Sequence, residues 1–179
     1  MLFYALFRHN YYHKNAERER IDLKRANNAL RLAASIAIPL IAGAASSLLT
    51  GRAMERYDSF TEPPLSPPGI VFPIVWTVLY ILMGISFYLV AEDKSAQTVK
   101  PVAVYFLQLI VNIIWPLLFF NKEAYLASFL WLVLLWLLVF CMIKLFYPIS
   151  KAAAWLNVPY LIWLTFAGYL NLGVYLLNR

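Results

Sequence analysis

Amide and aromatic side chains recur at helical spacing in one apolar stretch of the sequence. Gln108, Asn112, Trp115 and Phe119 are separated by four, three and four residues, which places them on one face of a helix. Amides in the middle of an apolar helix are costly when they face lipid, so we expect this face to point into a bundle of helices. There the amides can join helices by hydrogen bonds or bind the polar edge of a ligand, and both interpretations stay open.

Two further apolar stretches carry aromatic residues at the same kind of spacing. They are Trp76, Tyr80, Gly84 and Phe87 in one stretch, and Tyr160, Trp163, Ala167, Leu170 and Val174, with Asn171 beside them, in the other. An aromatic stripe alone more often indicates packing than a pocket. Three such stripes together with amides favour a pocket for a flat, apolar ligand.

The apolar stretches lack the groups that acid–base, metal or ion-pumping chemistry requires. No Asp, Glu, His or Arg lies in the middle of any of them, and proton relays and pumps normally need such groups. Phosphate-loop, serine-hydrolase and zinc-protease motifs are absent. His9 and His13 are too few ligands for a metal, and Cys141 has no partner for a disulfide. We therefore expect no metal site and no required cofactor.

The composition predicts that these stretches cross a membrane. Apolar residues make up 63% of the chain and charged residues 13%, whereas soluble domains have about 45–50% and about 25%. Disorder needs the opposite balance, and a β-barrel needs alternating polarity, which the run from Leu130 to Leu135 lacks. The expected fold class is all-α, an integral membrane bundle.

Five stretches reach the length of about 20 residues that a transmembrane helix needs. They are residues 30–50, 70–91, 102–120, 124–147 and 153–177. Short connections between them favour antiparallel neighbours in a compact bundle. We expect a five-helix membrane domain over residues 30–179 and a basic cytoplasmic extension over residues 1–29.

The distribution of basic residues predicts the orientation. With an N-terminus inside, eleven Lys and Arg residues lie on the cytoplasmic side and four on the other. Lys and Arg favour cytoplasmic loops, so the N-terminus is expected in the cytoplasm. The net charge of +6 is then mostly an orientation signal, and a nucleic-acid partner is not expected.

The longest connection between spans, residues 52–68, ends in a proline-rich segment. Four prolines lie between positions 63 and 68, and proline fixes φ and stiffens the chain. The segment is either a rigid linker or a lid over one end of the bundle, and length and rigidity do not favour one over the other.

Three ordered sets of residues match the pattern of one known family. They are the segment 56–68 followed by Phe72, Val75, Trp76, Leu79, Tyr80, Met83 and Gly84; then Gln108, Leu109, Asn112, Trp115, Phe119 and Phe120; then Pro159, Tyr160, Trp163, Phe166, Ala167, Leu170 and Asn171. On these residues the chain resembles the translocator protein family, also called tryptophan-rich sensory proteins or peripheral benzodiazepine receptors. Arg56 and Leu65 stand where the family pattern has tryptophan, Glu62 where it has lysine, and Trp131 where many members have an acidic residue.

The resemblance implies a five-helix bundle, usually a homodimer, that binds porphyrins and hydrophobic drug-like ligands, and sterols in some members, in a pocket under the first loop. Porphyrin is the expected ligand. The expected ligand-binding residues are Tyr57, Trp76, Tyr80, Gln108, Asn112, Trp115, Phe119, Trp163, Ala167, Leu170 and Asn171. Trp76 and Trp163 match positions implicated in light-dependent protoporphyrin breakdown in bacterial members.

The resulting hypothesis is a porphyrin-binding receptor or sensor in a bacterial cytoplasmic membrane, with lipid and a hydrophobic small molecule as partners. Two alternatives remain. One is a light-dependent porphyrin-degrading enzyme that uses Trp76 and Trp163, and the other is a transporter for porphyrins or related amphiphiles. The lack of ionisable groups in the spans disfavours coupled transport but not facilitated passage.

Overall fold

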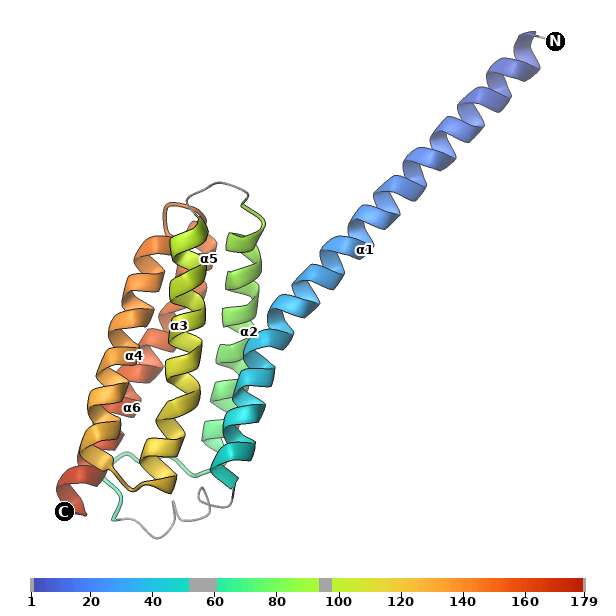
Figure 1. Cartoon of the computed structure of the whole chain (residues 1–179). Coiled ribbons are helices and arrows are strands. Elements are labelled where there is room, and N and C mark those ends of the chain that lie inside the picture. The colour runs from blue at the N-terminus through green and yellow to red at the C-terminus, as the bar shows by residue number, and fades with distance from the viewer. Residues whose placement is uncertain (1, 52–60, 94–97, 179) are drawn as a thin grey trace. The chain divides into compact units, whose positions relative to one another are not determined.

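A computed structural model describes residues 2–51, 61–93 and 98–178, with side chains from residue 17 onward. The chain divides into two compact units, residues 1–34 and residues 35–179. The helices are α1 (Leu2–Thr50), α2 (Val71–Ala91), α3 (Val99–Pro116), the π-helix η3 (Leu117–Asn121), α4 (Tyr125–Phe146), α5 (Lys151–Leu156) and α6 (Val158–Leu177) (Figure 1).

Among the residues that the structure describes, five helical segments are long and apolar enough to cross a membrane. They are Glu17–Thr50, Val71–Ala91, Val99–Asn121, Tyr125–Phe146 and Lys151–Leu177. This confirms the predicted all-α fold with five candidate transmembrane helices. The first unit is the first part of α1, in which every described side chain from Glu17 to Ala34 except Leu32 is exposed.

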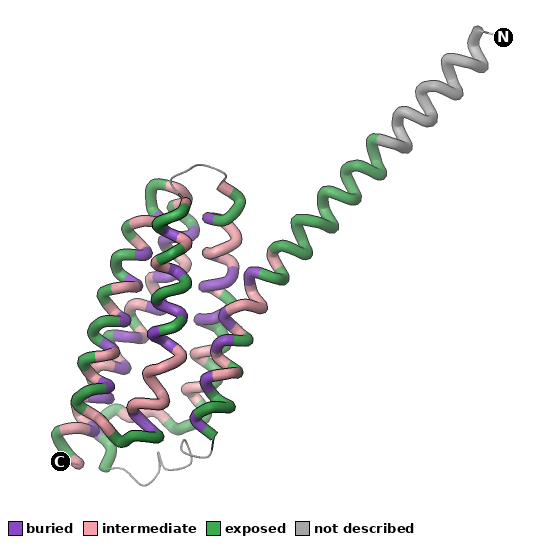
Figure 2. The backbone as a smooth tube through the Cα atoms, viewed as in Figure 1, coloured by how far each residue is buried: buried purple, intermediate pink, exposed green. Residues whose placement is uncertain are grey.

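The second unit is a bundle in which α2, α3, α4 and α6 run side by side (Figure 1). α4 packs against both α3 and α6, and α2 packs against α5. Buried residues face inward and exposed apolar residues cover the outside of the bundle (Figure 2). Many large apolar residues on the outside of a bundle suit contact with lipid chains, since soluble monomers rarely expose large apolar patches.

The third span changes from an α-helix to a π-helix at Pro116, whereas the sequence predicted one helix to residue 120. Proline has no backbone N–H and interrupts the regular ladder of backbone hydrogen bonds. Near this break, the Ser46 hydroxyl donates to the Ile113 carbonyl oxygen at 3.1 Å, which joins α1 to α3. The wider turn that follows buries two successive rings, Phe119 and Phe120.

The fifth span is broken at Asn157, between α5 and α6, although the sequence predicted one stretch over 153–177. Pro159 lies in the first turn of α6, a position where proline favours the start of a helix. The buried Asn157 amide nitrogen donates to the Ser86 hydroxyl at 2.6 Å and to the Ala153 carbonyl oxygen at 2.9 Å. The bond to Ser86 joins the break to α2, and the bond to Ala153 joins it to α5.

The described part of the proline-rich segment is fastened to the C-terminal half of α6. Pro63 is buried against Gly173, where an added Cβ would lie 2.6 Å from the proline Cβ. The Tyr169 hydroxyl donates to the Pro64 carbonyl oxygen at 2.6 Å. The Asn178 side chain accepts from the Thr61 backbone N–H and donates to the Thr61 carbonyl oxygen, both at 3.0 Å.

Candidate functional site: a cavity between the helices

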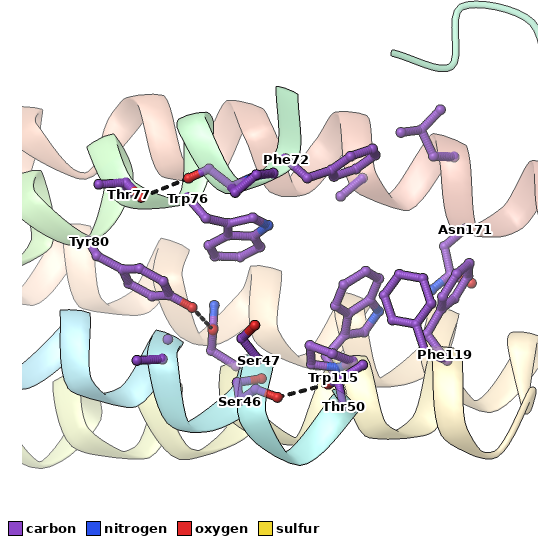
Figure 3. Close-up of a pocket in the computed structure, with 18 of the residues that line it drawn as sticks. Ser46, Ser47, Thr50, Phe72, Trp76, Thr77, Tyr80, Trp115, Phe119 and Asn171 are labelled. Carbon is purple, nitrogen blue, oxygen red and sulfur yellow. Dashed lines mark hydrogen bonds between the residues drawn. The ribbon is translucent and has the colours of Figure 1, made fainter. Parts of the chain in front are cut away.

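A cavity of about 410 Å³ lies within the second unit, between the end of α1, α2, α3 with η3, and α6 (Figure 3). Its volume falls in the range of about 300–1,000 Å³ that is typical of small-molecule sites. The wall consists of Leu40, Gly43, Ala44, Ser46, Ser47, Thr50, Ser66, Phe72, Pro73, Trp76, Thr77, Tyr80, Asn112, Trp115, Pro116, Phe119, Phe120, Ala167, Leu170, Asn171 and Val174. Most of these side chains are apolar.

Aromatic rings from α2, α3 and η3 project into the same space (Figure 3). Trp76 of α2 lies 5.4 Å, centroid to centroid, from the Tyr80 ring one turn further along the helix. Trp115 of α3 stacks on Phe119 at 5.4 Å, and Phe120 meets Phe119 edge-on at 4.8 Å. Such walls offer flat faces for stacking against a planar ligand.

A buried polar network forms one side of the cavity. The Tyr80 hydroxyl donates to Asn112 Oδ1 at 2.9 Å, and Asn112 Nδ2 donates to the Tyr160 hydroxyl at 2.7 Å. The Tyr160 hydroxyl in turn donates to Gln108 Oε1 at 3.2 Å. An amide has two N–H donors and two acceptor lone pairs. These bonds therefore leave one N–H and one lone pair of Asn112 uncommitted beside the cavity.

Asn171 fixes the position of Trp115. With its amide oriented to satisfy all partners, its oxygen accepts from the Trp115 indole N–H at 3.1 Å and its nitrogen donates to the Tyr125 carbonyl oxygen at 2.9 Å. The amide also contacts the Ser128 hydroxyl at 3.1–3.2 Å. One side chain of α6 thus joins α3 and α4, and it holds the Trp115 ring in the cavity wall.

The structure brings most of the residues singled out in the sequence to this cavity. Those that line it are Trp76, Tyr80, Asn112, Trp115, Phe119, Ala167, Leu170 and Asn171. Gln108 lies behind the wall, bonded to Tyr160 and, through Nε2, to Met83 Sδ at 3.9 Å. Trp163 also lies outside the wall and meets Phe72 edge-on at 5.9 Å. Tyr57 falls outside the described residues, and the ligand contacts of all eleven residues stay a prediction.

The sequence reasoning missed the contribution of α1. Gly43, Ala44, Ser46, Ser47 and Thr50 all line the cavity, although none of them was among the candidate residues named from the sequence. Packing is part of their role, because a Cβ on Gly43 would overlap the Tyr80 ring. The periodic spacing of these small residues was the available signal.

In the described part of the chain, no group of three or more His, Cys, Asp or Glu side chains is placed to hold a metal ion. The cavity instead offers aromatic faces, the hydroxyls of Ser46, Ser47 and Tyr80, and the amides of Asn112 and Asn171. These groups suit binding and orientation of an apolar ligand with a few polar atoms.

Comparison with known proteins identifies the family of the chain. It is 36% identical over 152 residues to the tryptophan-rich protein TspO of Chlorobaculum tepidum, and the matched region covers 83% of this chain and 96% of that protein. It is 37% identical over 152 residues to the tryptophan-rich protein TspO of Archaeoglobus fulgidus, covering 84% and 99%. The translocator protein 2 of Canis lupus familiaris is 36% identical over 135 residues, covering 73% and 78%. The family model of the TspO/MBR family matches residues 35–177, and the chain, an integral membrane protein, belongs to that family.

Proposed function

We propose that this protein is a membrane receptor or sensor that binds porphyrins and similar flat, hydrophobic ligands in the cavity. The observation that carries the proposal is an apolar, aromatic-walled space among helices that can span a membrane. Trp76 and Trp115 provide faces on which a macrocycle stacks. The uncommitted N–H and lone pair of Asn112 provide partners for its polar atoms.

The hydrogen bonds that join the helices of the cavity wall support a sensing role. Asn112 on α3 is bonded to Tyr80 on α2 and to Tyr160 on α6. A ligand that engages this amide acts on the bonds between three helices at once. A relative from Cereibacter sphaeroides is named tryptophan-rich sensory protein, and this name supports the same interpretation. If the ligand binds one arrangement of these three helices more tightly than another, its binding stabilises that arrangement by the difference in binding free energy.

The test is an absorption titration of the purified protein with protoporphyrin in the dark, in nanodiscs of phosphatidylcholine. Empty nanodiscs provide the control, because porphyrins also partition into lipid. The proposal predicts a saturable change that depends on the protein and is reversed by an uncharged, drug-like aromatic competitor. A signal that rises linearly with lipid and is the same without protein contradicts it.

Illumination of the same samples tests the photochemical alternative. Trp76 lines the cavity, and Trp163 contacts the cavity-lining Phe72, so both tryptophans lie at or near the proposed porphyrin position. An enzyme of this kind yields a breakdown product under light that Trp76→Phe abolishes while dark binding persists. Porphyrin flux into sealed vesicles, above that of protein-free vesicles, identifies a transporter.

The membrane arrangement belongs to the same proposal. We place the protein in a bacterial cytoplasmic membrane with its N-terminus inside, on the basis of the eleven-to-four distribution of basic residues. We also propose a homodimer. Cross-linking in native membranes tests the second point, where a dimer band that is independent of protein expression level is the expected result.

A further inference from the structure

The exposed residues of the cavity wall lie on two helices, α1 and α2. Among the described wall residues, the exposed ones are Ala44 and Ser47 on α1 and Pro73 and Thr77 on α2. Every wall residue that α3, η3 and α6 contribute is buried or half-buried. The cavity therefore opens along the seam between α1 and α2, which these four residues define.

The packing of α1 explains why this seam stays open. α2 has buried residues from Leu79 onward and none in its first two turns, before Leu79. A Cβ on Gly84 would overlap the backbone of Ile36, so α1 and α2 touch at that level. Further along, α1 is bonded to the third span instead: Ser46 donates to the Ile113 carbonyl oxygen, and Asn121 Nδ2 donates to the Leu49 carbonyl oxygen at 3.2 Å.

The residues beside the seam are those of a lipid-facing surface. On α1, Ile41 and Leu48 are 67% and 82% exposed, and on α2, Ile74 and Val78 are 58% and 51% exposed. The Thr77 hydroxyl is satisfied within its own helix, because it donates to the Pro73 carbonyl oxygen at 2.7 Å. This hydroxyl therefore needs no water, which suits contact with hydrocarbon.

The described part of the proline-rich segment closes a different side. Ser66 lines the cavity and is half-buried, and its hydroxyl donates to the Pro63 carbonyl oxygen at 2.9 Å. Pro63 is buried against Gly173, and the Tyr169 hydroxyl donates to the Pro64 carbonyl oxygen. A ligand that entered from water past this segment would have to break these contacts. A ligand that entered through the seam would leave them intact.

We infer that ligands enter and leave the cavity sideways, from the hydrocarbon layer of the membrane, through the seam between α1 and α2. The inference rests on the proposed function and adds the source of the ligand, which is a pool of apolar or amphipathic molecules already dissolved in the bilayer. Access then depends on how far a molecule partitions into lipid and on whether it fits between Ala44, Ser47, Pro73 and Thr77.

The first test needs no ligand. Tryptophan emission is measured in nanodiscs of phosphatidylcholine with brominated acyl chains and in unbrominated discs, for the native chain and Trp76→Phe. The difference isolates the emission of Trp76, which lies in the wall beside the seam. Lipid chains that reach the seam quench this emission, and the double substitution Ala44→Phe and Ser47→Phe protects it. An emission of Trp76 that bromine leaves unchanged overturns the inference, whether or not porphyrins bind.

The second test measures the rates of protoporphyrin binding and release in unbrominated discs. The double substitution Ala44→Phe and Ser47→Phe narrows the seam and lowers both rates by about tenfold, equivalent to about 1.4 kcal/mol of added barrier. The matched control is Ala103→Phe with Ala127→Phe, two exposed positions outside the cavity wall, which leaves both rates unchanged.

Slower release is the informative result, since a site that is only damaged releases its ligand faster. Unchanged rates, or faster release with unchanged binding, overturn the inference. A native chain that binds no porphyrin contradicts the proposed function alone, and the bromine measurement then decides the question of the seam.

Discussion

Asn112→Leu removes a side chain that joins two other helices and also faces the cavity. It deletes the bond from Tyr80 and the bond to Tyr160. Side-chain hydrogen bonds between membrane helices average about 0.6 kcal/mol, so the two together contribute about 1.2 kcal/mol. A loss of that size lowers the melting temperature of a chain of this length by about 2–5 °C. Thermal unfolding in detergent measures the shift.

A double-mutant cycle tests whether these bonds are the cause. Asn112→Leu and Tyr80→Phe remove the same bond, so their effects on the free energy of unfolding should fall short of additivity by about 0.6 kcal/mol. Ser86→Ala is the matched control, because Ser86 is a buried hydroxyl of α2 that bonds the Ala153 carbonyl oxygen instead. Full additivity with Tyr80→Phe would refute the reasoning.

The same variant separates the two roles that the amide can play. If a ligand uses the uncommitted donor and acceptor of Asn112, porphyrin affinity per folded molecule falls by about 1–3 kcal/mol, roughly 5- to 150-fold. We expect this loss in addition to the lower melting temperature. An unchanged affinity with a lowered melting temperature would leave Asn112 only the role of joining helices.

Three further changes have defined outcomes. Gly84→Ala should destabilise the folded chain by about 1–3 kcal/mol because the added Cβ meets the α1 backbone. Gly168→Ala is the control, because a Cβ there makes only ordinary contacts, and it should be neutral or stabilising in thermal unfolding. Equal effects of the two changes would contradict the close approach of α1 and α2. Gly173→Ala should displace the proline-rich segment and speed its cleavage by added protease, and an unchanged cleavage rate would show that the segment is held elsewhere. A cysteine at Phe60 but not at Asn10 should react with an impermeant thiol reagent outside intact cells, and the reverse pattern would mean an inverted topology.

The spans and much of the cavity wall follow from the sequence because both depend on local spacing. Apolar runs of sufficient length define the membrane segments. Amides that are costly in lipid must turn inward. Trp115 is three residues from Asn112 and therefore lies on the same inward face of the helix. Aromatic residues one turn apart, such as Trp76 and Tyr80, arrive in the wall for the same reason.

The parts that the sequence did not predict depend on breaks and on contacts between helices. Pro116 leads into a π-helix that the sequence did not predict, and both Phe119 and Phe120 of this helix lie in the cavity wall. Trp163 shares a periodic stripe with Ala167, yet it ends beside Phe72 outside the wall. The stripe of a helix defines a face, and only the neighbouring helices determine which part of that face borders a cavity.

The central claim is that an apolar ligand occupies this cavity, and the dissociation constant of protoporphyrin for a cavity-filling variant tests it most directly. Ala167→Phe places a ring into the space from the buried α6 wall. Ala127→Phe, on an exposed face of α4, adds the same ring outside it. We expect Ala167→Phe to weaken binding by about tenfold or more, equivalent to about 1.4 kcal/mol, at an unreduced melting temperature, and Ala127→Phe to bind like the native chain. Equal, native-like dissociation constants for both variants would contradict it.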